Sequence, residues 1–239
     1  MHPLLRRARA LLRDATTIDV ARFTPASHPL ARRKRLLDTH GIDLVFDVGA
    51  NLGQYATEIR DLGYAGWIIS YEPLSSAFAE LERAAARDPK WRAVKQGLGP
   101  HAGTATLNIA GNSQSSSVLP MLEAHVAAAP ESQFVGTETI ELQTLARALD
   151  AHGDLGTRVF VKIDAQGYER AILESAPLER VTGMQLEMSL VPLYAGETLM
   201  SDMLALLEQR GFVVMSLEPG YSDPRTGRLL QVDGVFFRE

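Results

Sequence analysis

The feature that most constrains the fold is a glycine-containing segment, Asp-Val-Gly-Ala-Asn-Leu-Gly at residues 47–53, which directly follows an apolar run. The apolar residues 44–48 predict a buried strand, and residues 53–62 have the spacing of an amphipathic helix. A glycine turn between a strand and a helix is typical of open α/β sheets, in which ligands bind at the carboxyl ends of the strands. The segment therefore predicts an α/β fold with a ligand site at this turn.

Further along the chain, apolar runs alternate with helical segments, which is the pattern of βαβ units and a mostly parallel, doubly wound sheet. Seven strands are expected, at residues 44–48, 67–71, 92–96, 159–163, 184–188, 212–217 and 234–237. The main helices are expected at residues 30–39, 53–62, 75–87, 167–175 and 199–210.

Composition excludes several classes of function. The net charge of -5 gives no electrostatic reason to expect a nucleic-acid partner. Because the chain has no cysteine, disulfides, zinc thiolate sites and a cysteine nucleophile are excluded. No apolar run approaches the roughly 20 residues of a membrane span, and no signal-peptide core follows the N-terminal arginines. We therefore expect a cytoplasmic protein.

One α/β domain is expected at residues 41–239, preceded by a helical extension at residues 1–40. The extension begins with a basic amphipathic helix, which we expect to pack on its own domain or on a neighbouring subunit of a homo-oligomer rather than on a membrane. Residues 101–154 interrupt the βα pattern, and their segments 104–109 and 138–142 alternate as strands do. We expect this insertion to recognise the substrate.

The chemistry of the glycine turn favours S-adenosylmethionine. Gly49 and Gly53 allow the backbone to approach a ligand closely, and amides at the start of a helix favour the methionine carboxylate. Asp47 can stabilise the cationic groups of the same ligand, whereas it would repel the pyrophosphate of a dinucleotide. Glu72, after the next strand, can accept hydrogen bonds from ribose hydroxyls.

Other nucleotide and hydrolase motifs are missing. No lysine follows a glycine, so the phosphate-binding loop of nucleotide hydrolases is excluded as a motif match. The Gly-x-Ser-x-Gly elbow of α/β hydrolases and a Tyr-x-x-x-Lys pair are also absent. An NAD-dependent oxidoreductase and a noncatalytic scaffold with a cofactor fold are the alternatives that stay open.

A second motif, Val-Lys-Ile-Asp-Ala-Gln-Gly-Tyr-Glu at residues 161–169, accompanies the first. Together with Gly-Leu-Gly at 97–99 and the serines at 115–117, the two motifs resemble the FkbM-type methyltransferase family. The resemblance runs from about Asp43 to the C-terminus. It implies a class I methyltransferase fold with a seven-stranded sheet and an antiparallel last strand, and S-adenosylmethionine-dependent methylation of a hydroxyl on a saccharide or a similar small metabolite.

The motifs and the resemblance together give a set of expected cofactor contacts. They are Asp47, Gly49, Ala50, Asn51, Gly53, Gln54, Tyr55, Glu72, Pro73, Gly97, Leu98, Ser116, Asp164 and Gln166.

Methyl transfer to oxygen needs a group that removes the hydroxyl proton. Asp164, at the end of a strand, is the first candidate, although it can also cap the following helix. His125, in the insertion, is a second candidate base or a hydrogen-bond donor. Lys162 alternates with Asp164 and can neutralise carboxylates or stabilise an oxyanion. Glu187 ends the neighbouring strand, and with Asp164 it can hold Mg²⁺.

Overall fold

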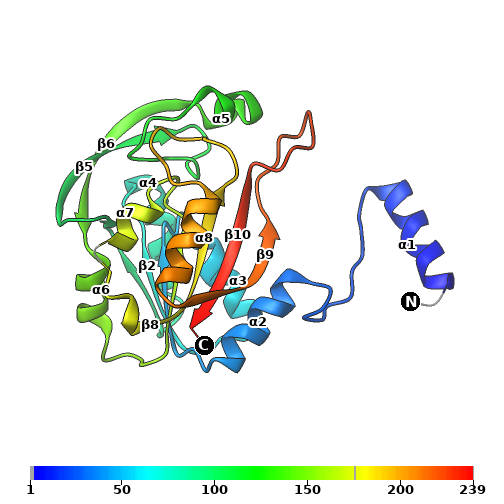
Figure 1. The fold of residues 1–239 in the computed structure, drawn as a ribbon, viewed down its shortest axis with the longest axis horizontal. Helices are drawn as coiled ribbons and strands as arrows, with labels where there is room; N and C mark the ends of the chain where they lie inside the picture. Colours follow the sequence, from blue (N-terminus) through cyan, green and yellow to red (C-terminus); the bar gives the residue numbers. More distant parts are fainter. Residues whose placement is uncertain (1–2, 175, 239) are drawn as a thin grey trace.

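The computed structural model describes residues 3–174 and 176–238. Its centre is a seven-stranded sheet in the order β3-β2-β1-β7-β8-β10-β9 (Figure 1). The strands are β1 (Leu44–Val48), β2 (Trp67–Tyr71), β3 (Trp91–Val94), β7 (Val159–Ile163), β8 (Val181–Ser189), β9 (Phe212–Pro219) and β10 (Gln231–Arg238). The strand β10 runs antiparallel to the other six strands and pairs with β8 and β9. The α/β class, the seven strands and the antiparallel last strand are confirmed.

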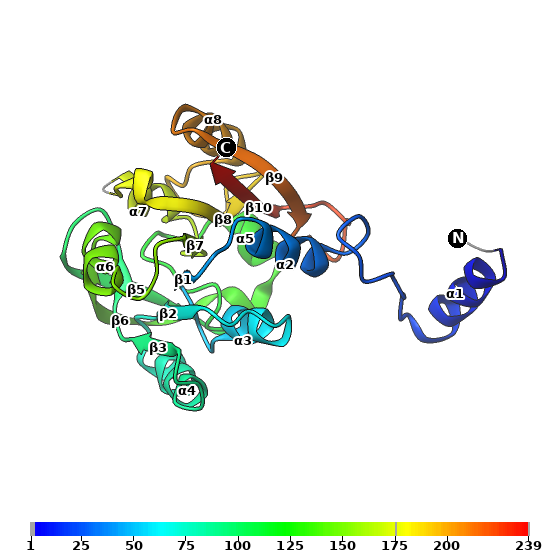
Figure 2. The same cartoon turned by 90° about the horizontal axis from the view of Figure 1, so that it is seen from below.

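Helices cover both faces of this sheet (Figure 2). One face packs against α2 (Pro29–Thr39), α3 (Gln54–Asp61) and α4 (Ser75–Ala85), and the other against α6 (Leu145–His152), α7 (Glu169–Glu174) and α8 (Met200–Gln209). The sequence pattern did not predict α6, which falls in the expected insertion. Its start is fixed by Thr144, whose hydroxyl accepts a hydrogen bond from the Arg147 amide.

Most predicted boundaries agree with the structure to within three residues, and the third strand shows why they shift. It was expected at 92–96 but ends at Val94, because the amide of Gln96 donates to the Val94 carbonyl and turns the chain. The strands at 44–48, 67–71 and 159–163 have the predicted bounds. These strands are mostly apolar, and this local pattern was enough to predict both ends of each.

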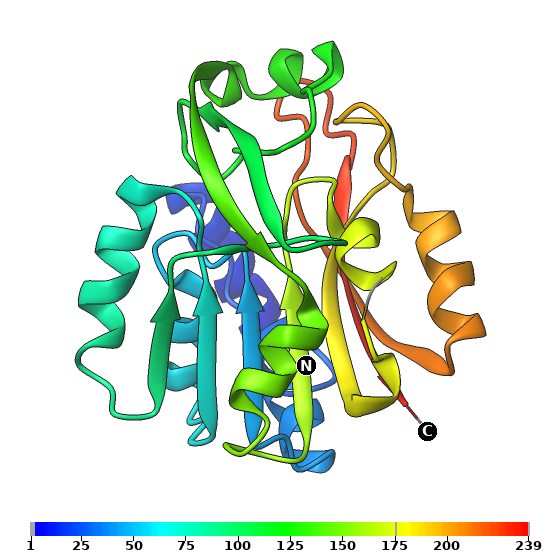
Figure 3. The same cartoon turned by 90° about the vertical axis from the view of Figure 1, so that its left-hand side faces the viewer.

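Two strands of the insertion join a short strand that precedes it to form a second, three-stranded sheet above the carboxyl ends of the main sheet (Figure 3). It consists of β4 (Gly97–Leu98), β5 (Gly103–Ala110) and β6 (Phe134–Gln143), and the short helix α5 (Glu123–Ala128) follows β5. Backbone hydrogen bonds of 2.8 Å join Leu122 to Leu193 and Ala195 to Pro120. The segment between β5 and α5 is therefore tied to the loop that leaves β8, and the second sheet covers the edge where ligands of this fold class bind.

The N-terminal segment has two unlike parts. In α2, Ala31 and Leu37 are buried against the main sheet, whereas α1 (Pro3–Thr16) extends away from the body of the protein (Figures 1 and 2). The expected packing of the first helix on its own domain is therefore wrong. Its contact with a neighbouring subunit stays a prediction. No helix among the described residues is long and apolar enough to cross a membrane.

Candidate active site

One face of the main sheet carries polar side chains at its carboxyl edge. In β1, Leu44, Phe46 and Val48 belong to one layer of the core and Val45 to the other. Since side chains alternate along a strand, Asp47 lies on the Val45 face, beside α3. It is fully buried in a strand that is otherwise apolar.

The register of the sheet places further polar residues beside Asp47. Lys162 on β7 is the register partner of Asp47, and Gln185 on β8 is the partner of Lys162. On the next strand, Asp233 of β10 lies opposite Glu187 of β8. Four neighbouring strands therefore contribute a row of polar side chains to one edge of the sheet.

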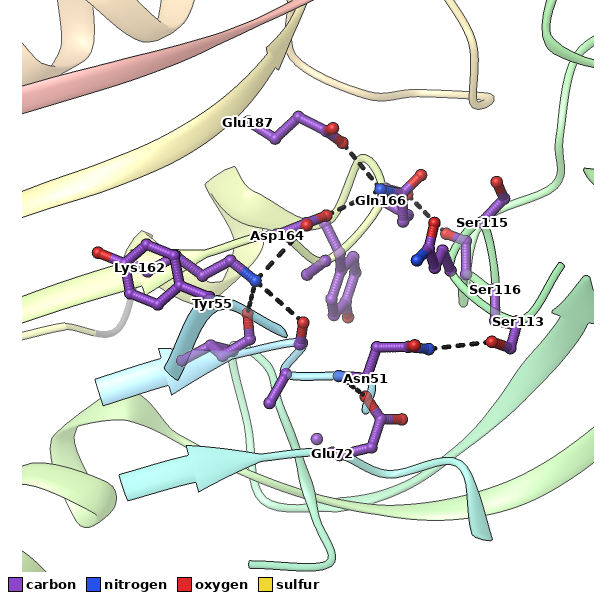
Figure 4. A pocket seen from close by; sticks show the side chains of 18 of the residues that line it. Asn51, Tyr55, Glu72, Ser113, Ser115, Ser116, Lys162, Asp164, Gln166 and Glu187 are labelled. Atoms are coloured by element: carbon purple, nitrogen blue, oxygen red, sulfur yellow. Dashed lines mark hydrogen bonds and ion pairs between the residues drawn. The ribbon is translucent and has the colours of Figure 1, made fainter. Parts of the chain in front are cut away.

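Lys162 connects the two sequence motifs. Its ammonium lies 3.3 Å from Oδ1 of Asp47, 3.5 Å from Oδ2 of Asp164 and 3.0 Å from the carbonyl of Gly49 (Figure 4). Burial tends to lower the pKa of Lys162, but the carboxylates of Asp164 and Asp47 outweigh it and the pKa is raised. The raised pKa favours the protonated form of Lys162, which pairs with the buried carboxyl group of Asp47.

Gln166 forms hydrogen bonds to the carboxylates of Asp164 and Glu187. It adopts a left-handed backbone conformation with φ of 51°, and its Nε2 donates to Oδ1 of Asp164 and to Oε2 of Glu187, both at 2.8 Å (Figure 4). The Gln166 Oε1 lies 2.7 Å from the hydroxyl of Tyr194, on the loop after β8. Gln166 therefore fixes the orientation of both carboxylates from one side.

Glu72 follows β2 and joins the glycine turn to the next helix. Its carboxylate accepts hydrogen bonds of 2.8 Å from the amides of Asn51 and Leu74. Burial raises its pKa to about 7, although both amide hydrogen bonds oppose that shift. A carboxylate has about four lone-pair sites, so Glu72 retains capacity for ligand hydroxyls.

A cavity of about 600 Å³ lies between the carboxyl edge and the second sheet. The four residues expected to be catalytic, Asp164, His125, Glu187 and Lys162, all line it. The expected cofactor contacts that line it are Gly49, Ala50, Asn51, Gln54, Tyr55, Glu72, Pro73, Gly97, Leu98, Ser116, Asp164 and Gln166.

Two expected cofactor contacts lie outside this lining. Asp47 is directed to Lys162 and Ser70, so it supports the site from below instead of meeting the ligand. Gly53 has a φ of 87°, and an added Cβ would lie 2.8 Å from the Trp91 ring. Its lack of a side chain therefore serves the packing of the turn.

His125 is built into the roof of the cavity. It is 3% exposed, and its ring lies 5.1 Å from that of Tyr194 and 5.7 Å from that of Tyr221. Burial lowers its pKa, which favours the neutral imidazole. Its Nδ1 has no hydrogen-bond partner among the described residues.

The carboxylates do not form a site that fits Mg²⁺. The described part of the chain contains no group of three His, Asp or Glu side chains arranged to hold a metal. Between Asp164 and Glu187 lies the side-chain amide of Gln166, whose N–H group donates a hydrogen bond to each carboxylate. Glu187 accepts a further hydrogen bond of 2.8 Å from the side-chain amide of Gln231. Amide N–H groups are not metal ligands, so the predicted magnesium site at Asp164 and Glu187 is not supported.

Comparison with known protein families matches residues 47–214 to the FkbM methyltransferase domain. This match covers more than two-thirds of the chain and includes both motifs. The chain belongs to the FkbM methyltransferase family. Family membership makes it a methyltransferase with S-adenosylmethionine as methyl donor, and it decides against the NAD-dependent alternative.

Solved structures resemble the fold at low sequence identity. The FkbM methyltransferase of Methylobacillus flagellatus is 13% identical with a TM-score of 0.46; the alignment covers 81% of this chain and 43% of that one. TrmK of M. capricolum, solved with S-adenosylhomocysteine, is 5% identical with a TM-score of 0.48, and 89% and 70% are covered. A precorrin-6y C5,15-methyltransferase of Geobacter metallireducens is 14% identical with a TM-score of 0.44, and 87% and 88% are covered. No curated protein matches the sequence.

The residues present in this FkbM methyltransferase fit the donor. The cavity volume lies within the range of small-molecule sites. Apolar side chains gather around Gly97 and Pro73, next to Glu72, and this part of the cavity is suited to an adenine ring, while the Glu72 carboxylate is suited to ribose hydroxyls. The apolar residues are Leu98, Leu107, Ile140 and Leu142.

Several residues of the site were missed by the sequence analysis. Gln185, Gln231 and Asp233 line the cavity from β8 and β10, and Arg33 reaches it from α2. Glu169 is buried, and its Oε1 accepts hydrogen bonds from the amides at 165 and 167 of the second motif. Polar residues at alternate positions of an apolar strand, as in 185 and 187, were the signal available.

Proposed function

We propose that the protein transfers the methyl group of S-adenosylmethionine to a hydroxyl oxygen of a saccharide or a similarly hydroxylated small molecule. The observation that supports oxygen as the acceptor is the carboxylate of Asp164. Its side chain is 34% exposed, lies at the carboxyl end of β7 and lines the cavity. A hydroxyl must lose its proton as it attacks, and a carboxylate accessible from the cavity can receive it.

S-adenosylmethionine supplies a methyl group on a positively charged sulfur, and that sulfur keeps the electron pair of the broken bond. Gly49, Ala50 and Asn51 of the turn, together with Glu72 and Pro73, are proposed to hold it. Asp164 accepts the proton of the attacking hydroxyl while the new carbon–oxygen bond forms. Hydrogen bonding from Gln166 and the charge of Lys162 keep that carboxylate in one orientation.

The structure gives Asp164 the stronger case as base over His125. The imidazole is almost fully buried between Tyr194 and Tyr221, which is the arrangement of a packing residue, whereas the carboxylate is accessible. His125 is therefore proposed to shape the roof above the acceptor. A neutral imidazole with a free nitrogen can still accept a proton, so the test includes both residues.

The test combines binding with transfer. Calorimetry with S-adenosylhomocysteine is expected to show binding by the wild type and by Asp164→Asn. Labelled S-adenosylmethionine incubated with fractionated host glycans is expected to give labelled product, which Asp164→Asn reduces by about 10²–10⁴-fold. If His125→Asn abolishes transfer while Asp164→Asn does not, the base is His125. Loss of transfer with a chelator would restore the magnesium hypothesis.

The outcome that contradicts the proposal is transfer to nitrogen or carbon. Mass spectrometry of the product locates the methyl group, and an N-methyl or C-methyl product would replace the hydroxyl acceptor. The absence of S-adenosylhomocysteine binding would contradict the assignment of the donor site.

A further inference from the structure

The cavity extends beyond the residues proposed to hold the methyl donor. Its far wall is formed by Gln185 and Glu187 of β8 and by Gln231 and Asp233 of β10, and all four line the cavity. Residues two apart on a strand point to the same side, so each strand contributes a pair to this wall. We call these four residues the β8–β10 wall.

The β8–β10 wall holds two carboxyl groups, those of Glu187 and Asp233, which form no ion pair with a described Lys, Arg or His side chain. Among the described residues, Lys162 and Arg33 are the only lysine and arginine that line the cavity. Lys162 is paired with Asp47 and Asp164, and Arg33 lies 2.6 Å from Glu58 and 2.7 Å from Glu218. Within residues 3–174 and 176–238, no Lys, Arg or His nitrogen lies within 4.0 Å of the carboxylates at 187 and 233.

The carboxylates of the wall repel one another. Glu187 and Asp233 are directly opposite on antiparallel strands, a position where like charges destabilise a sheet. Burial raises the pKa of both, and repulsion from Asp164 adds to the rise in each; Lys162 opposes the rise in both and Arg33 opposes it in Asp233, but neither cation lies within 4.0 Å of these carboxyl groups. A ligand that brings positive charge would relieve this repulsion.

A second, independent observation is the side chain of Gln185. It is 4% exposed, it lines the cavity, and its Oε1 has no hydrogen-bond partner among the described residues. A buried carbonyl oxygen without a donor costs free energy. Gln185 therefore calls for a ligand that donates hydrogen bonds.

The groups of the β8–β10 wall suit an ammonium group better than a metal ion. The side-chain amide of Gln166 already donates to Glu187 (Figure 4), and that of Gln231 does so too, so a metal would meet N–H groups as well as oxygens. An ammonium group carries both a positive charge and three N–H donors. It matches two carboxylates and one free carbonyl without displacing the amides.

We propose that Gln185, Glu187 and Asp233 bind a protonated amine carried by the methyl acceptor. This inference rests on the proposed function, and it narrows the acceptor to a hydroxylated molecule that bears an amino group, such as an amino sugar. The amine anchors the acceptor at the β8–β10 wall and leaves its hydroxyl free for Asp164.

Tris and pentaerythritol provide a matched pair of probes, because they differ only by an ammonium in place of a hydroxymethyl group. Each is titrated into protein saturated with S-adenosylhomocysteine, in phosphate buffer at about pH 7, where the amine is protonated. Ligand-observed NMR measures binding. Tris is expected to bind at least about tenfold more tightly than pentaerythritol.

The double variant Glu187→Gln/Asp233→Asn is expected to lose this preference while still binding S-adenosylhomocysteine. Glu80→Gln/Asp61→Asn, which removes two exposed carboxylates from α4 and α3, is the matched control and should retain it. Equal binding of the two probes, binding of neither, or an unchanged preference in the double variant would overturn the inference. Failure of the wild type to bind S-adenosylhomocysteine would contradict the proposed function instead.

Discussion

Lys162 on β7 places its ammonium 3.3 Å from Oδ1 of Asp47, its register partner on β1. Asp47 belongs to the first sequence motif and Lys162 to the second, so this ion pair links the two motifs directly. Asp47 is completely buried, and burial raises its pKa although Lys162 opposes the rise. The pair therefore supports the glycine turn from beneath the cavity.

Replacing Lys162 with methionine is expected to lower the free energy of unfolding by about 3–5 kcal/mol, because it leaves the Asp47 carboxylate buried without its partner. The double variant Lys162→Met/Asp47→Asn should recover much of this loss. Urea unfolding of the wild type and the three variants completes the cycle. If the double variant is no more stable than Lys162→Met, the two residues do not act as a pair.

Gly49 is expected to tolerate no side chain. It has a φ of 70°, and an added Cβ would lie 1.8 Å from the backbone oxygen of Asp164. Gly63, with a φ of 88° and open space around it, is the matched control. Gly63→Ala should cost about 1–2 kcal/mol from backbone strain alone. Gly49→Ala should cost more and abolish S-adenosylhomocysteine binding; equal effects would refute the close approach.

Glu169 is expected to make stability depend on pH. Burial raises its pKa to about 7, so the folded state holds the proton more tightly than the unfolded state. Its contribution to stability is full below about pH 4.5, falls as the pH rises towards 7 and is lost above that value. Glu169→Gln should flatten this decline by an amount on the order of 2 kcal/mol.

Glutamine keeps the acceptor Oε1, so Glu169→Gln retains the hydrogen bonds to the amides of the second motif. Urea unfolding at about pH 5 and pH 7.5 measures the effect. Glu72, whose pKa is also raised to about 7, leaves a residual slope in the variant. An unchanged slope would show that Glu169 titrates normally.

Tyr194 is expected to couple the loop after β8 to the second motif. Its hydroxyl lies 2.7 Å from Oε1 of Gln166 and 3.0 Å from the carbonyl of Ser115. Tyr194→Phe should cost about 1–3 kcal/mol of stability and lower kcat/KM, because Gln166 loses its restraint. Tyr221, whose hydroxyl has no partner among the described residues, is the control: Tyr221→Phe should leave the unfolding free energy nearly unchanged.

Removing residues 1–20 is expected to leave the fold intact, because α1 extends away from the sheet (Figure 1). The thermal unfolding temperature should change little. Leu37→Ala in α2 is the contrast: this side chain is 4% exposed in the core, and its loss should cost about 2–5 kcal/mol. A large destabilisation by the truncation would show that α1 packs on the protein in solution, and a change in mass by light scattering would reveal a role between subunits.

Local patterns determined most of the fold. The apolar runs at β1, β2 and β7 gave their strand bounds correctly, since strand and helix periods are properties of neighbouring residues. Asp164 and Lys162 of the second motif and Glu187 of the neighbouring strand line one cavity, because the carboxyl ends of parallel strands share an edge. The short helix α6 and the extension of α1 away from the main sheet were not predicted. The hydrophobic period of a segment does not by itself determine what that segment packs against.

The far wall of the cavity was decided only by the tertiary structure. The last strand was predicted at 234–237, after Asp233, whereas β10 begins at Gln231 and runs antiparallel between β8 and β9. Its first residues therefore lie at the carboxyl edge of the parallel strands, opposite Ser189 and Glu187. A sequence pattern indicates that a segment forms a strand, but it does not indicate which strands will lie beside it. Strand order and register are set by packing across the whole sheet, and they brought Asp233 to Glu187.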